Sequence, residues 1–533
     1  MAATHAIVNA HIRTMDPSNP IASAVAWQGN TIIAVGSDAA IREAIDATTR
    51  VTDAHGATLT PGLVDGHQHL LHGSEFAQGL NLDRVQTLGE LREKIAQERR
   101  RIGPDAWLMG FALEYAAFEG ATYHHSLLNE VSGPGPMFLY TLDVHTGYVN
   151  GKALEIAGLT SAVTLSDGSI VSVDHDDKPT GELLEMAAMQ LVLSHVPSPT
   201  VEQKLQWYAQ TIADQNALGI TEIHMMDGNL DSLEIFRALE GRDELNMRVL
   251  QHHFVYPYTS SEEVEEMLLS KNQHGTMWQA DGVKFMLDGV IDTGTAWLEE
   301  PDTFGDGTEP MWPDLNLYHS RARMFHEAGF RIATHAIGDR AVREVLDFYA
   351  SLPHGSQGKH RIEHIETSPD STVARFAPEQ VTASMQPIHT RWIAHDMTDP
   401  WSQRLGAHRC GHGWRSGDIF ASGALVVLGS DWPVAPYDPR MGFFAAQERR
   451  AHDVSDPRPI GHTRALTAEQ TLAGYTVNPA RAVGMSHHRG QIKVGLAADL
   501  VLWEADPVKV SPADIIDMNI VQTVANGKVV FSA

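Results

Sequence analysis

Two histidines, His67 and His69, follow an apolar stretch of the chain and are separated by a single residue. On a β-strand, side chains two residues apart point to the same face, so both imidazoles would converge on one point. Neutral imidazole is the commonest protein ligand of divalent transition metals. The pair therefore indicates a metal site, although a chain with 29 histidines also contains such pairs by chance.

Four further residues with metal-binding or catalytic side chains stand in or directly after other apolar stretches. They are Lys284, His335, His364 and Asp431. Each has an ordinary structural explanation when taken alone: a histidine or an aspartate can cap a helix, and a lysine can lie on the surface. Together with His67 and His69 they place four histidines, a lysine and an aspartate at the ends of predicted strands, which favours one shared site.

The elements that must position these residues alternate between apolar and amphipathic stretches, as in βα units. Amphipathic stretches such as His319–Ala328 and Arg340–Tyr349 predict helices between the strands. Eight such units are typical of a (β/α)₈ TIM barrel, whose chemistry lies at the carboxyl ends of the strands. The eight predicted strands are Leu59–Asp65, Gly219–Met225, Arg248–Val255, Gly282–Leu287, Arg331–Thr334, Arg361–Glu363, Val381–Met385 and Leu425–Leu428.

The two ends of the chain have a different pattern, with short strands and turn residues such as Gly29-Asn30 and Asn526-Gly527. We expect residues 1–58 and 485–533 to form one composite β-sandwich, and residues 59–484 to form the barrel. The gap between the first two barrel strands is too long for a βα loop. Residues 75–215 therefore predict an inserted subdomain within the barrel.

Bulk properties restrict the possible partners and the compartment. A formal net charge of −28 over 533 residues argues against nucleic acid or an anionic membrane as a partner. Cys410 is the only cysteine, so an intrachain disulfide and a thiolate metal cluster are both excluded. The sequence has no signal-peptide pattern and no apolar run of membrane-spanning length. We expect a cytoplasmic protein that acts on a small-molecule substrate, with a homodimer as the assembly to consider.

Several motifs resemble those of the amidohydrolase superfamily, in particular amidohydrolase family 3 and its YtcJ-like branch, which includes enzymes similar to N-substituted formamide deformylase. The resemblance covers nearly the whole chain, and it implies a barrel fold and metal-dependent hydrolysis of a carbon–nitrogen bond. The motifs are Pro61–His69, Val283–Gly289, Thr334–Asp339, Arg361–His364, Ser384–Pro387, Gly429–Asp431 and Gly490–Gly495 with Ala498–Val501.

The resemblance also implies a role for each residue of the set. His67, His69 and Asp431 would hold a buried divalent ion, and His335 and His364 would hold a second, more exposed one. Lys284 would be carboxylated on Nζ, and this N6-carboxylysine would bridge the two ions. A lysine beside two cations favours deprotonation, which such a modification requires. If Lys284 is unmodified, a single-ion site of His67, His69, His335 and Asp431 is the alternative.

The expected reaction is hydrolysis of an amide or formamide bond by a metal-bound hydroxide. Asp431 would act as the general base, with Lys284 and His335 also in the catalytic set. Zinc is the expected ion, at one or two per chain, while manganese, iron and nickel suit the same donors. Hydrolytic deamination of a ring, and a non-catalytic barrel acting as a binding or regulatory scaffold, are the alternative functions.

Four residues are candidates for substrate binding, although each has an equally ordinary structural interpretation. His145 resembles a family segment that reaches into the site, but it could be a structural histidine. Trp297 and Trp432 could line an apolar pocket or simply pack in the core. Arg391 could bind a substrate carboxylate.

Overall fold

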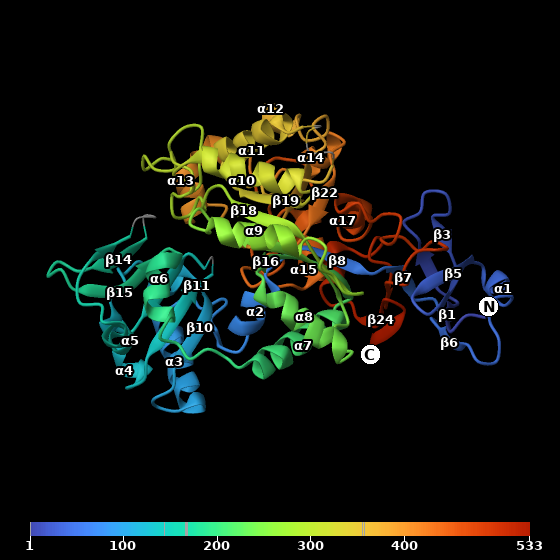
Figure 1. Ribbon diagram of the computed structural model, residues 1–533, viewed down its shortest axis with the longest axis horizontal. Helices are drawn as coiled ribbons and strands as arrows, with labels where there is room; N and C mark the ends of the chain where they lie inside the picture. Colours follow the sequence, from blue (N-terminus) through green and yellow to red (C-terminus); the bar gives the residue numbers. More distant parts are fainter. Residues whose placement is uncertain (1, 143, 166–168, 354, 356–357) are drawn as a thin grey trace. The chain divides into compact units, whose positions relative to one another are not determined.

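The computed structural model describes residues 2–142, 144–165, 169–353, 355 and 358–533. The chain divides into two compact units. The first consists of Met1–Leu70, Ala209–Asp431 and Pro436–Ala533. The second consists of Leu71–Tyr208 with Trp432–Ala435 (Figure 1).

The centre of the first unit is a sheet of eight strands that follow one another in chain order, β8-β16-β17-β18-β19-β20-β21-β22. Every neighbouring pair is parallel. The sheet is nearly closed, because a Cβ atom added to Gly66 in β8 would meet Val427 Cγ1 in β22 at 2.2 Å. This arrangement fits the predicted (β/α)₈ barrel. The strands are β8 (Leu63–Gln68), β16 (Ile220–Gly228), β17 (Arg248–Val255), β18 (Trp278–Met286), β19 (Arg331–Ala336), β20 (Arg361–His364), β21 (Thr382–Met385) and β22 (Val426–Leu428).

Amphipathic helices lie beside these strands, as Figure 1 shows for α9 (Ser261–Ser270), α10 (Leu315–Glu327) and α11 (Asp339–Ser351). The Asp314 side chain caps α10, so that helix begins four residues before the predicted one. The predicted helix Arg340–Tyr349 lies within α11, whose buried apolar face packs in the barrel's main hydrophobic cluster. Burial of one apolar face against the sheet is what stabilises such helices.

The first predicted barrel strand, Leu59–Asp65, is wrong in its bounds, because the structure divides it between two sheets. β7 (Thr58–Pro61) pairs with β23 (Leu500–Trp503), whereas β8 belongs to the barrel. The chain leaves one sheet for the other at Gly62, where an added Cβ atom would lie 2.1 Å from Thr221 Oγ1. Only glycine permits that close approach.

Two further sheets of the first unit use strands from the chain ends. One has the order β5-β4-β1-β6, and the other, β25-β24-β23-β7-β2-β3, combines N-terminal and C-terminal strands. Buried side chains of both sheets, such as Trp27 and Leu500, share one apolar cluster. Their packing as a composite β-sandwich stays a prediction. The other strands are β1 (His5–Val8), β2 (His11–Arg13), β3 (Ile21–Ala22), β4 (Ala24–Gln28), β5 (Thr31–Gly36), β6 (Arg50–Asp53), β24 (Ile520–Ala525) and β25 (Lys528–Ser532).

The second unit contains a mixed sheet of the order β13-β14-β15-β12-β11-β10-β9. The helix α3 (Leu88–Ile102) begins with a capping box between Thr87 and Glu90. The strands are β9 (Leu80–Asn81), β10 (Leu108–Leu113), β11 (Met137–Thr141), β12 (Thr146–Val149), β13 (Val163–Thr164), β14 (Ile170–Val173) and β15 (Pro179–Leu184). The bounds of the predicted inserted subdomain, 75–215, stay a prediction.

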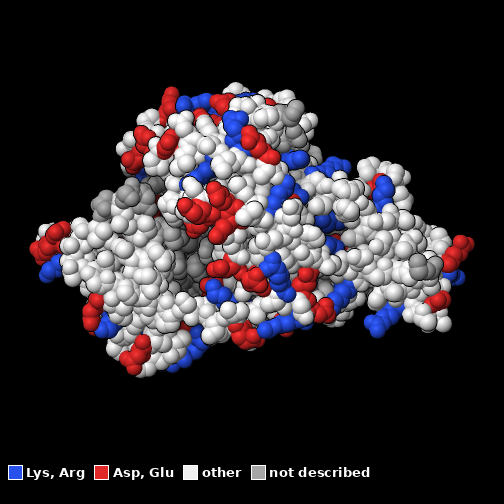
Figure 2. Space-filling view, in the orientation of Figure 1, with Lys and Arg blue, Asp and Glu red and all other residues white. Residues whose placement is uncertain are grey.

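The surface carries both signs of charge. Figure 2 shows acidic and basic side chains interspersed over the face in view, as in an ordinary globular protein. Across the described parts of the chain, none of the helices has the length and apolarity that a membrane crossing requires.

Candidate metal centre

The barrel brings the six predicted ligands to the carboxyl ends of its strands. His67 lies near the end of β8 and His364 ends β20, while Asp431 follows β22 by three residues. Lys284 and His335 lie in β18 and β19, and all of these side chains are buried, while His69 is partly exposed. Because parallel strands end at the same side of a barrel, residues far apart in sequence meet there.

The Asp431 carboxylate is the centre of the site. Its Oδ1 atom lies 3.1 Å from His67 Nε2 and 3.1 Å from His69 Nε2. Its Oδ2 atom lies 3.8 Å from His364 Nδ1 and 3.7 Å from His389 Nε2. One carboxylate is therefore faced by four imidazole nitrogens, two at each oxygen.

His389 was not among the predicted site residues. It lies in the 3-10 helix η3 (Pro387–Trp392), four residues after the end of β21. A pattern in the sequence does point to it, since it follows a barrel strand at the same end as the other ligands. The intervening Pro387 and the helical turn separate it from the strand and weaken that pattern.

The protonation of His67 is fixed by Glu363. The Nδ1 atom of His67 lies 2.5 Å from Glu363 Oε2 and donates to it, so Nε2 carries a lone pair. Burial, and then the charge of Lys284, lower the pKa of His67, which keeps the ring neutral. A lone pair of His67 thus faces a carboxylate oxygen of Asp431.

That arrangement fits a bound cation. Four of the facing atoms, His67 Nε2, His364 Nδ1, His389 Nε2 and Asp431 Oδ1, are buried without a hydrogen-bond partner in the described structure. Buried polar atoms normally have partners, and unpartnered lone pairs at about 3–4 Å repel one another. A divalent ion among them would satisfy all four, and imidazole with carboxylate is a donor set that suits zinc.

Lys284 is fully buried in β18. Burial lowers its pKa to about 8, although the charges of Glu363 and Asp431 oppose the change. A lowered pKa increases the fraction of neutral amine, which is the form that can react with carbon dioxide. The environment therefore suits the predicted N6-carboxylysine, which stays a prediction.

His335 packs against His364, with 4.5 Å between the ring centroids. Its Nε2 atom lies 3.1 Å from the Gly289 carbonyl oxygen and 3.5 Å from Asp288 Oδ1. Asp288 also accepts hydrogen bonds from the backbone N–H groups of Trp297, Ile337 and Gly338. Asp288 thus joins the segment at Trp297 to the segment at Ile337-Gly338, and it also orients the His335 ring.

The backbone is strained at two of the ligands. His364 has a φ of 74° and Asp431 has a φ of 61°, both in the left-handed region that residues with a Cβ atom rarely adopt. The Asp431 N–H donates to the His67 carbonyl oxygen at 2.8 Å, which holds one of these turns. Such strain gathers at functional sites, where the surrounding structure enforces it.

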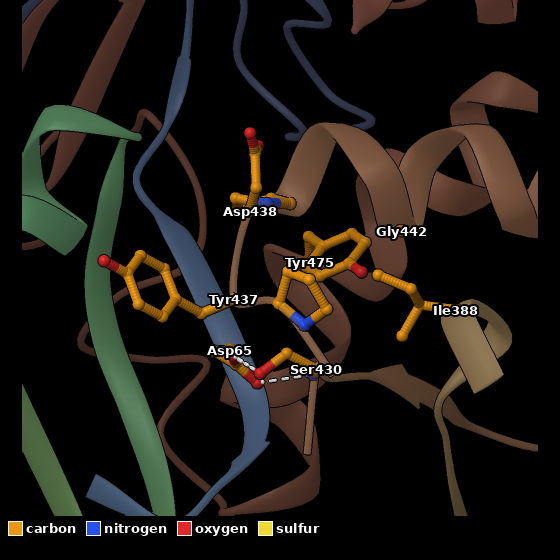
Figure 3. Close-up of a pocket in the computed structure, with 9 residues that line it drawn as sticks. Asp65, Ile388, Ser430, Tyr437, Asp438, Gly442 and Tyr475 are labelled. Atoms are coloured by element: carbon orange, nitrogen blue, oxygen red, sulfur yellow. Dashed lines mark hydrogen bonds between the residues drawn. The ribbon is translucent and has the colours of Figure 1, made fainter. Parts of the chain in front are cut away.

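Asp65 supports the residues of the site and lines a small pocket together with Tyr437 and Tyr475 (Figure 3). Asp65 accepts hydrogen bonds from the Ser430 N–H at 3.0 Å, the Ser430 hydroxyl at 2.5 Å and the His67 N–H at 3.2 Å. Burial raises the pKa of Asp65 to about 6, and these hydrogen bonds oppose that rise. Asp65 therefore joins the ends of β8 and β22, which carry His67 and Asp431.

Two predicted substrate-binding residues of the first unit already have partners. Trp297 is buried in the main hydrophobic cluster, and the Arg340 guanidinium lies 5.2 Å from its ring centroid. Arg391 is buried, with its Nη2 atom 3.6 Å from Asp453 Oδ2 and its guanidinium over Trp392. Their role in substrate binding stays a prediction.

The other two predicted substrate-binding residues belong to the second unit. His145 Nδ1 lies 3.0 Å from Glu185 Oε2. Trp432 packs so closely on Gly73 that a Cβ atom added there would lie 2.2 Å from the indole ring. Within that unit both side chains have structural contacts, and their role toward a substrate also stays a prediction.

Comparisons with known proteins bear on the family and the fold of the chain. The model of the amidohydrolase family matches residues 50–531. The putative amidohydrolase YtcJ of Bacillus subtilis is 26% identical over 534 residues, covering 98% of each chain. The N-substituted formamide deformylase of Arthrobacter pascens is 25% identical over 543 residues, covering 98% of this chain and 97% of the relative. An uncharacterized metal-dependent hydrolase from Pyrococcus horikoshii has the same fold, with a TM-score of 0.74, 23% identity and coverage of 95% of this chain and 99% of the other.

Proposed function

The chain belongs to the amidohydrolase family, and from this premise we propose that it is a metal-dependent hydrolase that cleaves a carbon–nitrogen bond of a small amide or formamide. The observation that carries the proposal is the Asp431 carboxylate faced by four imidazole nitrogens. The Arthrobacter pascens relative, named as an N-substituted formamide deformylase, supports the substrate class. A cytoplasmic location is part of the proposal, supported by the single cysteine, which permits no intrachain disulfide.

Zinc is the proposed ion. His67 and His69 with Asp431 Oδ1 would hold it, and the predicted second set of His335, His364 and carboxylated Lys284 would hold another. A bound divalent ion acidifies water and polarises a carbonyl oxygen. The remaining steps are carried out by side chains of the protein.

Asp431 is the proposed general base. Its two oxygens face the imidazole nitrogens that would hold the ion. The carboxylate therefore lies close enough to that position to accept a proton from the attacking water. Water adds to the carbonyl carbon, the carbon–nitrogen bond breaks, and the proton from Asp431 leaves with the amine.

We also infer that the two terminal sheets pack as the composite β-sandwich, which would support the start of β8, the strand that carries His67. β7 of the terminal sheet runs into β8 through a single residue, and the Gly62 N–H donates to the Asp499 carbonyl oxygen at 2.8 Å. The shared apolar cluster supports this packing. The sandwich would then fix the start of the strand that carries His67.

Replacement of Asp431 tests the proposed function. We expect Asp431→Asn to fold and to lose hydrolysis by about 10²- to 10⁴-fold, because the amide cannot accept the proton. The measurement is amine release from a panel of N-formyl and N-acyl amines, with protein reconstituted with zinc and with protein treated with a chelator. Asp456→Asn is the matched control, since that carboxylate pairs with Arg458 on the surface. A parental rate for Asp431→Asn would reject the assigned base, and equal rates with and without metal would reject the function.

A further inference from the structure

His389 has a buried nitrogen that the proposed mechanism does not use. Its Nε2 atom has no hydrogen-bond partner among the described residues, and it lies 3.7 Å from Asp431 Oδ2. The Nδ1 atom of His364 is also buried without a hydrogen-bond partner among the described residues, and it lies 3.8 Å from the same oxygen. The two imidazoles lie face to face, with 6.2 Å between centroids and 16° between planes. Each of the three residues offers one ligand atom within 4.8 Å of the others.

The two oxygens of Asp431 divide the histidines into separate groups. Oδ1 faces His67 and His69, whereas Oδ2 faces His364 and His389. A carboxylate that presents one oxygen to each of two donor groups has the form of a bridging ligand. The second group therefore forms an ion position of its own beside the first.

The distances suit an ion at that second position. Zinc binds histidine nitrogen at about 2.0–2.1 Å, so two ligand atoms at a tetrahedral angle lie about 3.4 Å apart. The observed 3.7 and 3.8 Å need only small shifts of the side chains to reach that value. The His335 Nε2 atom, in contrast, faces the Gly289 carbonyl oxygen at 3.1 Å.

The surroundings of His389 hold the ring in this orientation. The backbone N–H of His389 donates to the Gln386 carbonyl oxygen at 3.0 Å, and Trp392 packs against the ring with 5.1 Å between centroids. On its other side, Nδ1 lies 3.9 Å from Glu366 Oε1. At that distance no direct hydrogen bond forms, but the negative charge of Glu366 favours a proton on Nδ1 and so leaves the lone pair on Nε2, the nitrogen that faces Asp431.

We propose that His389 is a metal ligand, and that His364, His389 and Asp431 together form a second divalent-cation position. This proposal rests on the proposed function and replaces its second ligand set, because His389 and Asp431 join His364 in place of His335 and carboxylated Lys284. The position is complete without a carbamate on Lys284. Binding of the second ion is therefore expected without added bicarbonate.

Metal binding tests the proposal independently of turnover. Protein freed of metal is titrated with zinc or cobalt ions, and bound metal is counted by mass spectrometry after gel filtration, with affinities from chelator competition. We expect two ions per chain for the parent and one for His389→Gln, with the affinity of the retained ion unchanged. The lost ion should bind at least about 100-fold more weakly, since changes outside the ligand shell alone cost 10- to 100-fold. His175→Gln, whose side chain is 88% exposed, is the matched control and should bind two.

Crystals of the parent protein loaded with cobalt give a measurement that needs no variant. An anomalous peak within bonding distance of His389 Nε2 supports the proposal, and peaks confined to His67 and His69 overturn it. Two ions of parental affinity in His389→Gln also overturn it. A parent that binds one ion and still hydrolyses amides overturns the second position while the proposed function stands. A parent that binds no metal and hydrolyses nothing rejects both.

Discussion

At the scale of single residues, the orientation of His67 depends on a buried ion pair beneath it. Burial opposes ionisation of Glu363, but the Arg361 guanidinium and the His67 ring hold its pKa well below the usual range. Arg361 donates to Glu363 at 2.5 Å through Nε and to the Gly66 carbonyl oxygen at 2.6 Å through Nη2. Arg361 thereby holds the Glu363 carboxylate in place, and Glu363 in turn orients the His67 ring. Because Glu363 accepts the proton on Nδ1 of His67, Nε2 carries no proton.

Loss of the Glu363 charge should therefore weaken metal binding without removing a ligand. We expect Glu363→Gln to lower the affinity for the more tightly bound ion by about 10- to 100-fold, because outer partners of metal-binding histidines contribute that much. Competition with a chelator measures the change. Glu379→Gln, in a partly exposed ion pair with Arg375, should leave the affinity unaltered. An unchanged affinity in Glu363→Gln would show that the tautomer of His67 does not depend on this contact.

At the scale of elements, the base of the barrel depends on an ion pair between distant segments. Glu222 in β16 and Arg489, which follows α17 (Val477–Ala482), are both buried and form a two-point contact with one distance of 2.9 Å. His224 lies 3.3 Å from Glu222 and 2.9 Å from Arg361, so the contact continues toward the site. Buried pairs of this kind are costly to break, because the remaining charge has lost its partner.

Removal of the Arg489 guanidinium should destabilise the fold. We expect Arg489→Met to lower the free energy of unfolding by about 3–5 kcal/mol, the range for a broken buried pair. Denaturant unfolding followed by circular dichroism measures it. Arg458→Met, in a surface pair with Asp456, should cost less than about 1 kcal/mol. If the double variant Glu222→Gln with Arg489→Met loses the sum of the two single effects, the pair is not coupled and the argument is wrong.

The barrel strands could be predicted from the sequence because parallel strands buried on both faces form continuous apolar runs. The prediction Arg248–Val255 coincides with β17. β18 begins four residues before the predicted Gly282, because Gln279 and Asp281 interrupt the apolar pattern at its partly exposed start. The Asn526-Gly527 turn between β24 and β25 is confirmed, with positive φ at both residues. These features are local, and local patterns predict them.

The family resemblance predicted from the motifs is confirmed by the family match and by the two relatives of nearly full coverage. The sequence could not predict contacts that depend on loop conformation. His389 reaches Asp431 only through the turn of η3, and Arg391 two residues later meets Asp453. The position of His389 after a strand indicates the end of the barrel at which it lies, but not that its ring reaches Asp431.

At the scale of the whole molecule, several of the 29 histidines are buried in the folded chain away from the Asp431 carboxylate. Burial lowers the pKa of His253 to about 4, that of His224 to about 4 and that of His360 to about 3. The folded state therefore keeps these rings neutral at pH values where an unfolded histidine, with a pKa near 6.5, already binds a proton. Acid must destabilise the fold, because unfolding then takes up protons.

His253 allows this linkage to be measured, because burial alone accounts for its lowered pKa. Its Nε2 atom lies 2.8 Å from Ser270 Oγ, a contact that glutamine can also make. As the pH falls from about 6.5 to about 4, the parent should lose up to about 3 kcal/mol of stability through this residue, at about 1.4 kcal/mol for each pH unit. His253→Gln lacks that contribution, so its free energy of unfolding should fall less steeply over the same range.

The measurement is urea unfolding from pH 7.5 to 4.5 for metal-loaded parent, His253→Gln and the exposed control His175→Gln. Contributions from metal and carboxylates are common to all three proteins and cancel in the differences. Parallel curves for the parent and His253→Gln would mean that the buried ring titrates as it does in the unfolded chain.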